Sequence, residues 1–282
     1  MIALYTAWKQ ITRGYIADTS LRRSVLIDWI RLLVGNRFVS PSSAGETQIN
    51  GQVFSYSKRA SLYGMFQEIF VAQNYYVPST DKPLVILDCG ANVGMASRYF
   101  LTRAPQARVV AFEPNPYTAA LLRKNLAHHG AAVQIHEVGL GGTEGSFELY
   151  TDTEDAASQS ASLTAHLKAK QYDVTPVQVS IQKLSSYING PIDVLKMDIE
   201  GLEVAVVREL REANMLQHVK RLFIEYHFDG VHSVDSLGQM LSDIEASGFH
   251  YVIHSGIAFP FMHRSTPITS CVSYKITAWQ PE

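Results

Sequence analysis

The stretch "LVILDCGANVG", residues 84–94, decides the expected fold of this chain. An apolar run stops at Asp88, and Gly90, Asn92 and Gly94 follow within six residues. The simplest interpretation is a buried strand that ends in a tight turn before a helix. A sharper one is a loop shaped around a nucleotide-like ligand, because glycine lets the backbone approach a ligand closely.

Short apolar strands and helices alternate through the chain that follows. The further expected strands of this regular part are 108–114, 133–140, 192–201 and 220–227. The helix expected over 116–130 begins with proline and ends with glycine, the usual asymmetry. Residues 250–256 and 270–279 are expected to close the sheet as an antiparallel pair. Strands that alternate with helices predict an α/β fold with a mostly parallel sheet covered on both faces.

The first part of the chain has a different character, and we expect residues 1–80 to be an extension before a main domain at 81–282. Residues 21–38 place apolar side chains at helical spacing. This stripe predicts packing against the main domain or a twin subunit, which would make the protein a homo-oligomer, and docking on a membrane surface is the alternative. Residues 39–51 are rich in Pro, Ser and Gly and predict a loop, and 52–58 alternate like a strand.

Composition limits the classes of function. The chain has 282 residues, 46% of them hydrophobic and 18% charged, which suits an ordered core. A formal net charge of −2 gives no indication of nucleic-acid binding. Two cysteines make no disulfide framework and favour a reduced compartment. Without a signal-peptide pattern or an apolar run of about 18–20 residues, a cytoplasmic protein with no transmembrane segment is expected.

The residues that follow the expected strands form one candidate site. Ligands of open α/β sheets bind at the carboxyl ends of the strands, where strand order reverses. Acids gather at these positions, whereas the strand bodies are almost entirely apolar. The set consists of Asp88, Gly90, Asn92 and Gly94, then Glu113 and Asn115, Val138 and Gly139, Lys196, Asp198 and Glu200, and finally Glu225 and His227.

The glycine spacing narrows the ligand. A dinucleotide fingerprint begun at Gly90 needs glycine at the positions that Asn92 and Met95 occupy, and no phosphate-binding P-loop motif occurs. Asp88 would repel phosphate oxygens, but it suits an ammonium group or a sulfonium. Glu113 follows the second strand, where a carboxylate accepts hydrogen bonds from both hydroxyls of an unphosphorylated ribose. A cationic adenosine compound, S-adenosylmethionine, fits these requirements.

At this point the sequence resembles a known family. The segments "VILDCGANVG", "VVAFEPNP", "VGLGG", "GSFELY", "DVLKMDIEGLE" and "FIEYH" occur in the order and spacing of the FkbM family of class I S-adenosylmethionine-dependent methyltransferases. The resemblance covers roughly residues 60–255. It implies a Rossmann-like, seven-stranded sheet with the cofactor lying across the first strands.

The resemblance also implies roles for the site residues. It places Asp88, Gly90, Asn92 and Gly94 on the methionine side of the cofactor, Glu113 at the ribose with Asn115 beside it, Val138 and Gly139 near the adenine, and Asp198 near the amino group and the acceptor. Assigned members of the family are mostly O-methyltransferases of natural products and sugars. The expected acceptor is therefore a hydroxyl on a small molecule or sugar.

Three side chains are candidates for catalysis on the acceptor side. His227 is the first candidate for the general base, since a neutral imidazole suits proton transfer near pH 7. Asp198 and Glu200 have three alternatives: to position the acceptor, to cap the following helix, or to bind a divalent cation with Glu225 and His227. The D-x-E pattern is weak evidence for a metal, so no metal site is assigned. Lys196 is expected to pair with the acids.

Other segments and other functions complete the expectations. Residues 1–80 and the polar segment 153–173 are expected to cover the acceptor, with aromatic residues in 63–66 and 73–78 as pocket walls or core. Two rival functions remain. One is a nicotinamide-dependent oxidoreductase, against which the missing glycines argue, and the other is a non-catalytic or membrane-docked protein that retains the fold.

Overall fold

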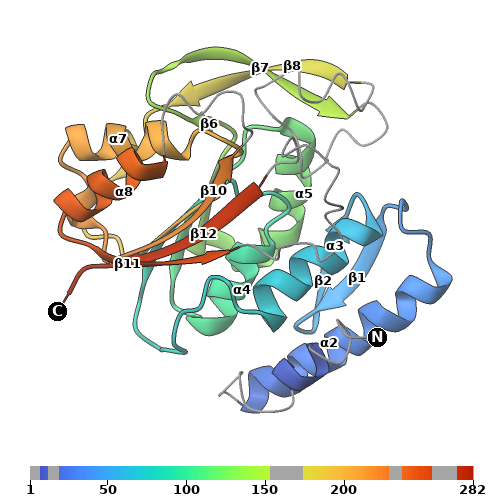
Figure 1. Cartoon of the computed structure of the whole chain (residues 1–282). Helices are drawn as coiled ribbons and strands as arrows, with labels where there is room; N and C mark the ends of the chain where they lie inside the picture. The colour runs from blue at the N-terminus through green and yellow to red at the C-terminus, as the bar shows by residue number, and fades with distance from the viewer. Residues whose placement is uncertain (1–6, 12–18, 153–173, 229–236, 256–271, 282) are drawn as a thin grey trace, which may run out of the picture.

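A computed structural model describes residues 7–11, 19–152, 174–228, 237–255 and 272–281. Its centre is a seven-stranded sheet with the order β11-β12-β10-β9-β3-β4-β5 (Figure 1). These strands are β3 (Val85–Cys89), β4 (Arg108–Phe112), β5 (Val133–His136), β9 (Val194–Met197), β10 (Arg221–Phe228), β11 (His250–Ser255) and β12 (Val272–Trp279). Only β12 runs antiparallel to its neighbours, so the predicted mostly parallel sheet with a closing antiparallel pair is confirmed.

Helices cover both faces of this sheet. Figure 1 shows α7 and α8 on one face and α4 and α5 on the other. Their bounds are α4 (Met95–Arg103), α5 (Pro116–Leu126), α7 (Glu203–Glu212) and α8 (Leu237–Ala246), and short helices follow at η2 (Ala127–Ala132), η3 (Leu184–Tyr187) and η4 (Leu216–His218). Successive strand residues point to opposite faces, so Ile86 and Leu87 belong to two different core clusters. Each face of the sheet is therefore packed with buried apolar side chains, which hold the strand ends in place.

The loops after β3 and β9 touch each other. Gly90 has a φ of 75°, and a Cβ atom built on it would lie 1.8 Å from the carbonyl oxygen of Asp198. Only glycine permits this contact between two backbones. Gly94, with a φ of 92°, then begins α4 as its N-cap, and the side chain of Asn115 caps α5 by accepting a hydrogen bond from the backbone N–H of Tyr117.

A second, three-stranded sheet lies beside the carboxyl edge of the first (Figure 1). It contains β6 (Gly139–Leu140), β7 (Gly145–Asp152) and β8 (Val174–Gln182). The single strand expected over 133–140 is therefore wrong. The chain leaves the large sheet after His136, and Gly139 and Leu140 pair instead with Ile181 and Gln182 of β8.

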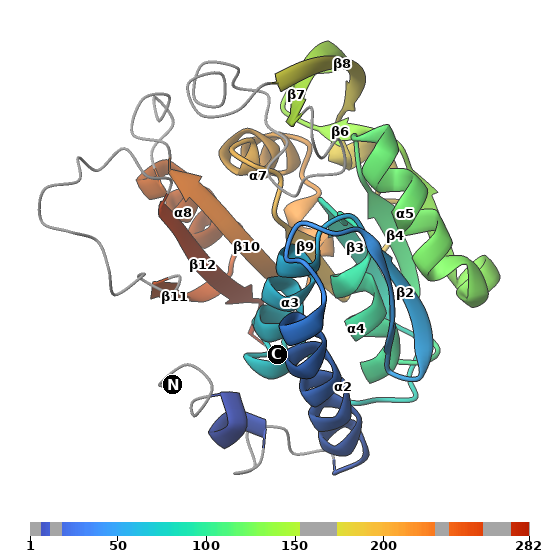
Figure 2. The same ribbon diagram turned by 90° about the vertical axis from the view of Figure 1, so that its right-hand side faces the viewer.

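The described part of the N-terminal region packs against the main sheet. It comprises a helical stretch at residues 7–11, then α2 (Thr19–Phe38), β1 (Gly45–Ile49), β2 (Gln52–Tyr56), α3 (Arg59–Phe66) and the π-helix η1 (Gln67–Val71) (Figure 2). β1 was missed, because its GETQI sequence is polar and its pairing with β2 supplies the order. The apolar stripe of α2 is buried in the same core cluster as β3 and β4, through Leu21, Val25, Trp29 and Leu32. No helix among the described residues is both long and apolar enough to cross a membrane.

Candidate active site

A cavity of about 490 Å³ opens at the carboxyl ends of β3, β4, β9 and β10, the edge at which the sequence predicted a site. Most of the predicted residues line it. They are Gly90, Asn92, Glu113, Val138, Gly139, Asp198, Glu200 and His227, with Lys196 and Glu225. Three predicted residues, Asp88, Gly94 and Asn115, lie outside the lining and act in the scaffold around it.

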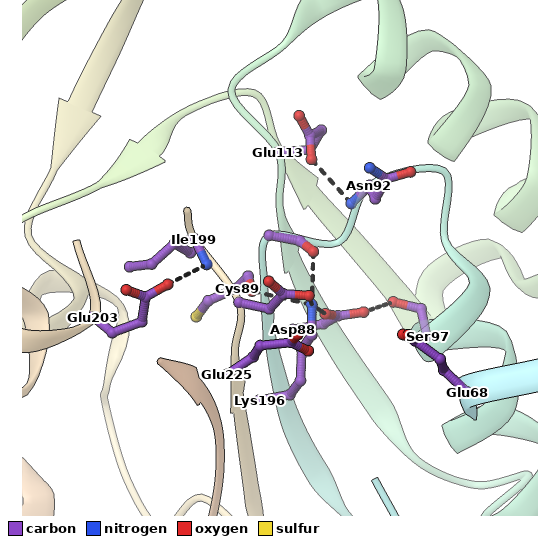
Figure 3. A network of polar contacts seen from close by, with 12 residues as sticks. Glu68, Asp88, Cys89, Asn92, Ser97, Glu113, Lys196, Ile199, Glu203 and Glu225 are labelled. Carbon is purple, nitrogen blue, oxygen red and sulfur yellow. Dashed lines mark hydrogen bonds and ion pairs between the residues drawn. The ribbon is translucent and has the colours of Figure 1, made fainter. Parts of the chain in front are cut away.

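Asp88 lies beneath the cavity floor, fully buried, and not in its wall. Its Oδ2 accepts a hydrogen bond of 2.6 Å from the hydroxyl of Ser97 in α4, and its Oδ1 lies 3.3 Å from the ammonium of Lys196 (Figure 3). Lys196 in turn donates to the carbonyl oxygens of Cys89 and Gly90. The pair ties β3, β9 and α4 together under the glycine loop. Direct contact between Asp88 and a ligand, expected from the sequence, is not what this geometry supports.

The ammonium of Lys196 also faces the cavity acids. It lies 3.7 Å from Oδ2 of Asp198, so the predicted pairing of this lysine with the acids is present. Burial lowers the pKa of Lys196, but the carboxylates of Asp88 and Asp198 outweigh burial and raise it above the ordinary value. The lysine therefore stays charged and attracts both Asp88, below the cavity, and Asp198, in the cavity lining.

Glu113 is buried at the end of β4, and backbone groups fix both of its oxygens. Oε2 accepts from the N–H of Asn92 at 2.9 Å (Figure 3), and Oε1 accepts from the N–H of Asn115 at 3.0 Å. Burial raises the pKa of Glu113 to about 7, although these two hydrogen bonds oppose the rise. Each oxygen keeps a second lone pair, so the ionised group can still accept from two neighbouring hydroxyls.

The far end of the cavity is apolar. Phe112, Val138, Leu140 and Ile181 line it, with Gly139 between them. A Cβ atom on Gly139 would lie 2.4 Å from Cδ1 of Ile181, so glycine keeps this part of the wall open. Here the second sheet forms the wall, and a flat apolar ring is the ligand group that such a slot accepts.

Glu203 organises the opposite end of the site, a role that the sequence analysis did not assign to it. This residue begins α7 and is almost fully buried. Its carboxylate accepts a hydrogen bond from the backbone N–H of Ile199 (Figure 3) and others from the N–H of Gly201, and it lies 3.0 Å from Nδ1 of His227. The sequence signal was an acid at the first helical turn, two residues after Gly201, but its contact with β10 requires the fold.

The environment of His227 contradicts the neutral imidazole expected from the sequence. Burial lowers the pKa of His227, but the hydrogen bond and charge of Glu203, together with the charges of Glu200 and Asp198, raise it to about 11. The imidazole surrounded by these acids therefore carries a proton at neutral pH. In that state His227 donates hydrogen bonds and cannot accept a proton from a ligand.

Asp198, Glu200 and His227 converge at this end of the cavity. One ligand-type atom of each lies within 4.8 Å of those of the other two. Nε2 of His227 is 3.7 Å from Oδ1 of Asp198, which is too long for a hydrogen bond. Burial raises the pKa of Asp198, while Lys196 opposes the rise.

The N-terminal region supplies one wall of the cavity. Gly64 and Met65 from α3 and Tyr75 line it. Of the aromatic residues expected in 63–66 and 73–78 as pocket walls or core, Tyr75 lies in the wall and Phe66 is buried in the core. Glu68, from the π-helix, faces Lys275 of β12 at 3.6 Å, and Lys275 also pairs with Glu225 at 3.1 Å. π-helices often mark functional sites, and this one brings a carboxylate to the cavity. Segment 153–173, also expected to cover the acceptor, lies outside the described residues.

Among curated proteins, several methyltransferases are similar to this chain. "Methyltransferase 1" of Beauveria bassiana is 33% identical over 162 residues, which are 51% of this chain and 65% of that protein. The "31-O-demethyl-FK506 methyltransferase FkbM" of Streptomyces tacrolimicus is 25% identical over 72% of this chain and 87% of its own length. The "2-O-methyltransferase NoeI" of Sinorhizobium fredii is 25% identical, over 50% and 63% respectively. The chain thus spans just under two thirds of two of these relatives.

A solved structure and a protein family are also similar to this chain. The methyltransferase FkbM of Methylobacillus flagellatus aligns with a TM-score of 0.44 and 14% identity over 77% of this chain and 54% of that one. The family described as "Methyltransferase FkbM domain" matches residues 88–251, more than half of the chain, from the buried aspartate of β3 into β11. The chain therefore belongs to the FkbM family of methyltransferase domains.

Proposed function

We propose that this protein transfers the methyl group of S-adenosylmethionine to a hydroxyl group of a small molecule or sugar. The observation that carries the proposal is Glu113, a buried carboxylate fixed by two backbone N–H groups at the end of β4. The family membership supports the cofactor, and the names of the O-methylating relatives support the type of acceptor. The domain division at residue 80 and the site residues named below are part of this proposal.

The residues present fit the cofactor. Glu113 would hold the two ribose hydroxyls, and the apolar slot around Gly139 would hold the adenine ring. Gly90 has no side chain, so its backbone can approach a ligand closely and would lie along the methionine portion of the cofactor. Carboxylates of the described lining outnumber its cationic groups, which suits a ligand with a sulfonium and an ammonium. The bound cofactor supplies an electrophilic methyl group.

The acceptor would enter beside Asp198, Glu200 and His227. Transfer requires the acceptor oxygen at about 3 Å from the methyl carbon and in line with the breaking bond. Since His227 is protonated, we assign proton acceptance to Asp198, whose pKa is raised and whose side chain is 29% exposed in the cavity. His227 would donate a hydrogen bond to the acceptor or hold the two acids. The wall from residues 60–75 would exclude water from the reacting groups.

The test has a binding arm and a transfer arm. Calorimetry should show S-adenosylmethionine bound to the full chain and NAD not bound. Glu113→Gln should weaken cofactor binding by about tenfold or more, since each hydrogen bond to a charged group contributes roughly 1.5–3 kcal/mol. Labelled methyl transfer onto small-molecule extracts, followed by identification of the product, would name the acceptor. Binding of NAD, or an unchanged dissociation constant in Glu113→Gln, would overturn the proposal.

A further inference from the structure

We infer that Asp198, Glu200 and His227 form a binding site for one divalent cation at the acceptor end of the cavity. The three side chains come from the ends of two neighbouring strands, β9 and β10, and their ligand-type atoms lie within 4.8 Å of one another. All three line the cavity, so a cation held there would keep open positions toward a ligand. Its role in methyl transfer rests on the proposed function, but its presence does not.

The arrangement around His227 is that of an outer-shell carboxylate behind a metal ligand. Glu203 is almost fully buried, lies outside the cavity lining, and holds Nδ1 at 3.0 Å. This contact orients the ring so that Nε2 points toward the other two side chains. A cation bound at Nε2 would displace the proton that this nitrogen carries in the absence of a cation, so binding would release one proton and strengthen as the pH rises. Metal-bound histidines nearly always donate their second N–H to such a partner.

The same carboxylate also shapes the loop that carries the other two ligands. It accepts hydrogen bonds from the N–H groups of Ile199 and Gly201, the residues on either side of Glu200. One buried group therefore sets the positions of all three candidate ligands. A helix cap alone would need no contact with β10.

The spacing fits a small cation better than a direct ion pair. Nε2 of His227 lies 3.7 Å from Oδ1 of Asp198, beyond hydrogen-bond distance. Adjacent ligands of a cation bound at roughly 2.1–2.3 Å lie about 3.0–3.4 Å apart, so Nε2 and Oδ1 must approach each other by roughly 0.3–0.7 Å. The three ligand atoms together lie within 4.8 Å of one another, so the site must tighten around the cation. Two carboxylates with one imidazole favour Mn²⁺ or Mg²⁺ over the thiolate-preferring metals. Such a cation would orient the acceptor hydroxyl and lower its pKa, while the free oxygen of Asp198 takes the proton.

The experiment is a titration of the chelator-treated full chain with Mn²⁺ alone, followed by calorimetry and electron paramagnetic resonance. One saturable Mn²⁺ per chain is expected. Glu200→Gln and His227→Gln should each weaken Mn²⁺ binding by at least about tenfold, and Glu203→Gln, which removes no ligand, by roughly 10–100-fold. Glu200 is exposed, so its substitution should not disturb folding.

The matched control is Glu68→Gln, which removes one negative charge from the same cavity, on the π-helix η1, and takes away none of the three candidate ligands. It should change Mn²⁺ affinity by less than about threefold if the site is specific. Equal weakening in Glu68→Gln and Glu200→Gln, or no saturable binding by the unaltered chain, would overturn the inference. A separate titration with S-adenosylmethionine distinguishes the two proposals. If the chain binds S-adenosylmethionine but not Mn²⁺, only the metal site is refuted. If it binds Mn²⁺ but not S-adenosylmethionine, only the proposed methyl transfer is refuted.

Discussion

The loops after β3 and β9 touch each other and meet the same cavity, yet they are built in opposite ways. The first loop turns its charge inward, with Asp88 buried below the floor, and presents glycine and backbone to the cavity. The second loop presents Asp198 and Glu200 to the cavity, and Glu203, the first residue of α7, supports this loop from outside the cavity lining. The half of the site formed by the loop after β3 is therefore built for shape, since glycine lets the backbone approach a ligand. The half formed by the loop after β9 is built for charge, since it presents carboxylates. Under the proposed function, the first half would hold the cofactor and the second half would face the acceptor.

The largest effect expected concerns the contact between the two loops. Gly90→Ala should lower the free energy of unfolding by about 2–5 kcal/mol, the sum of a left-handed conformation at about 1–2 and overpacking at about 1–3. The added methyl would lie 1.8 Å from the backbone of Asp198. Urea denaturation followed by circular dichroism measures the loss.

Gly51→Ala provides the control for that change. Gly51 has a φ of 76°, almost that of Gly90, but nothing lies within 4 Å of a Cβ atom placed there. It should cost only the conformational part, about 1–2 kcal/mol. If both alanines cost the same, the two loops are not in contact and the comparison drawn above fails.

The buried charge of the first loop should give the next largest effect. Asp88→Asn leaves the ammonium of Lys196 without its closest carboxylate, and breaking a buried pair costs roughly 3–5 kcal/mol. We expect about 3 kcal/mol, because Asp198 and two carbonyl oxygens still hold the lysine. In a double-mutant cycle with Lys196→Met, the two losses should sum to more than the loss in the double variant. Additive losses would show that the pair is not a unit.

The pH dependence of cofactor affinity tests Glu113, the buried acid directly after β4 to which the ribose contact is assigned. Its pKa is raised from 4.5 to about 7 by burial, with Asp88 and Lys196 as its charged neighbours. The folded chain thus keeps a proton that the unfolded chain releases, so this group's contribution to stability is full below pH 4.5 and disappears as the pH rises through 7. Cofactor affinity should depend on pH in the opposite direction and rise with pH, because the ribose hydroxyls donate hydrogen bonds to the ionised carboxylate.

Calorimetry at fixed ionic strength should show S-adenosylmethionine affinity rising about tenfold from pH 6 to pH 8. Glu113→Gln should bind more weakly and lose this dependence. The same slope in both proteins would assign the titration to another group and leave the ribose contact unsupported.

The smallest effect concerns strain in the charge-built loop. Glu200 has a φ of 58°, a conformation that glycine adopts more easily. Glu200→Gly should therefore change the free energy of unfolding by no more than about 1 kcal/mol, in either direction, while it abolishes the proposed cation binding. A loss of several kcal/mol would mean that this side chain serves the fold, and the division between the two loops would weaken.

The sequence predicted the centre of the large sheet because its strands expected at 84–88, 108–114 and 192–201 are short apolar runs closed by an acid or a proline. It also placed most of the cavity lining, since parallel strands bring their carboxyl ends to one edge. The departure of residues 139–140 into a second sheet was missed, because the change of partner sheet after His136 leaves no break in the apolar pattern of 133–140. The charge of His227 was missed for a related reason. It depends on Glu203, which is distant in sequence and meets the histidine only when α7 packs beside β10.

The position of β12 has a consequence for synthesis on the ribosome. This strand, near the end of the described chain, inserts between β10 and β11, and it carries Lys275, which faces Glu225 and also Glu68 from the N-terminal region. Domains begin to fold from the N-terminus as the chain emerges, but this sheet stays open until residue 279 has been added. A nascent chain would therefore lack this strand of the binding wall until residue 279 has left the ribosome.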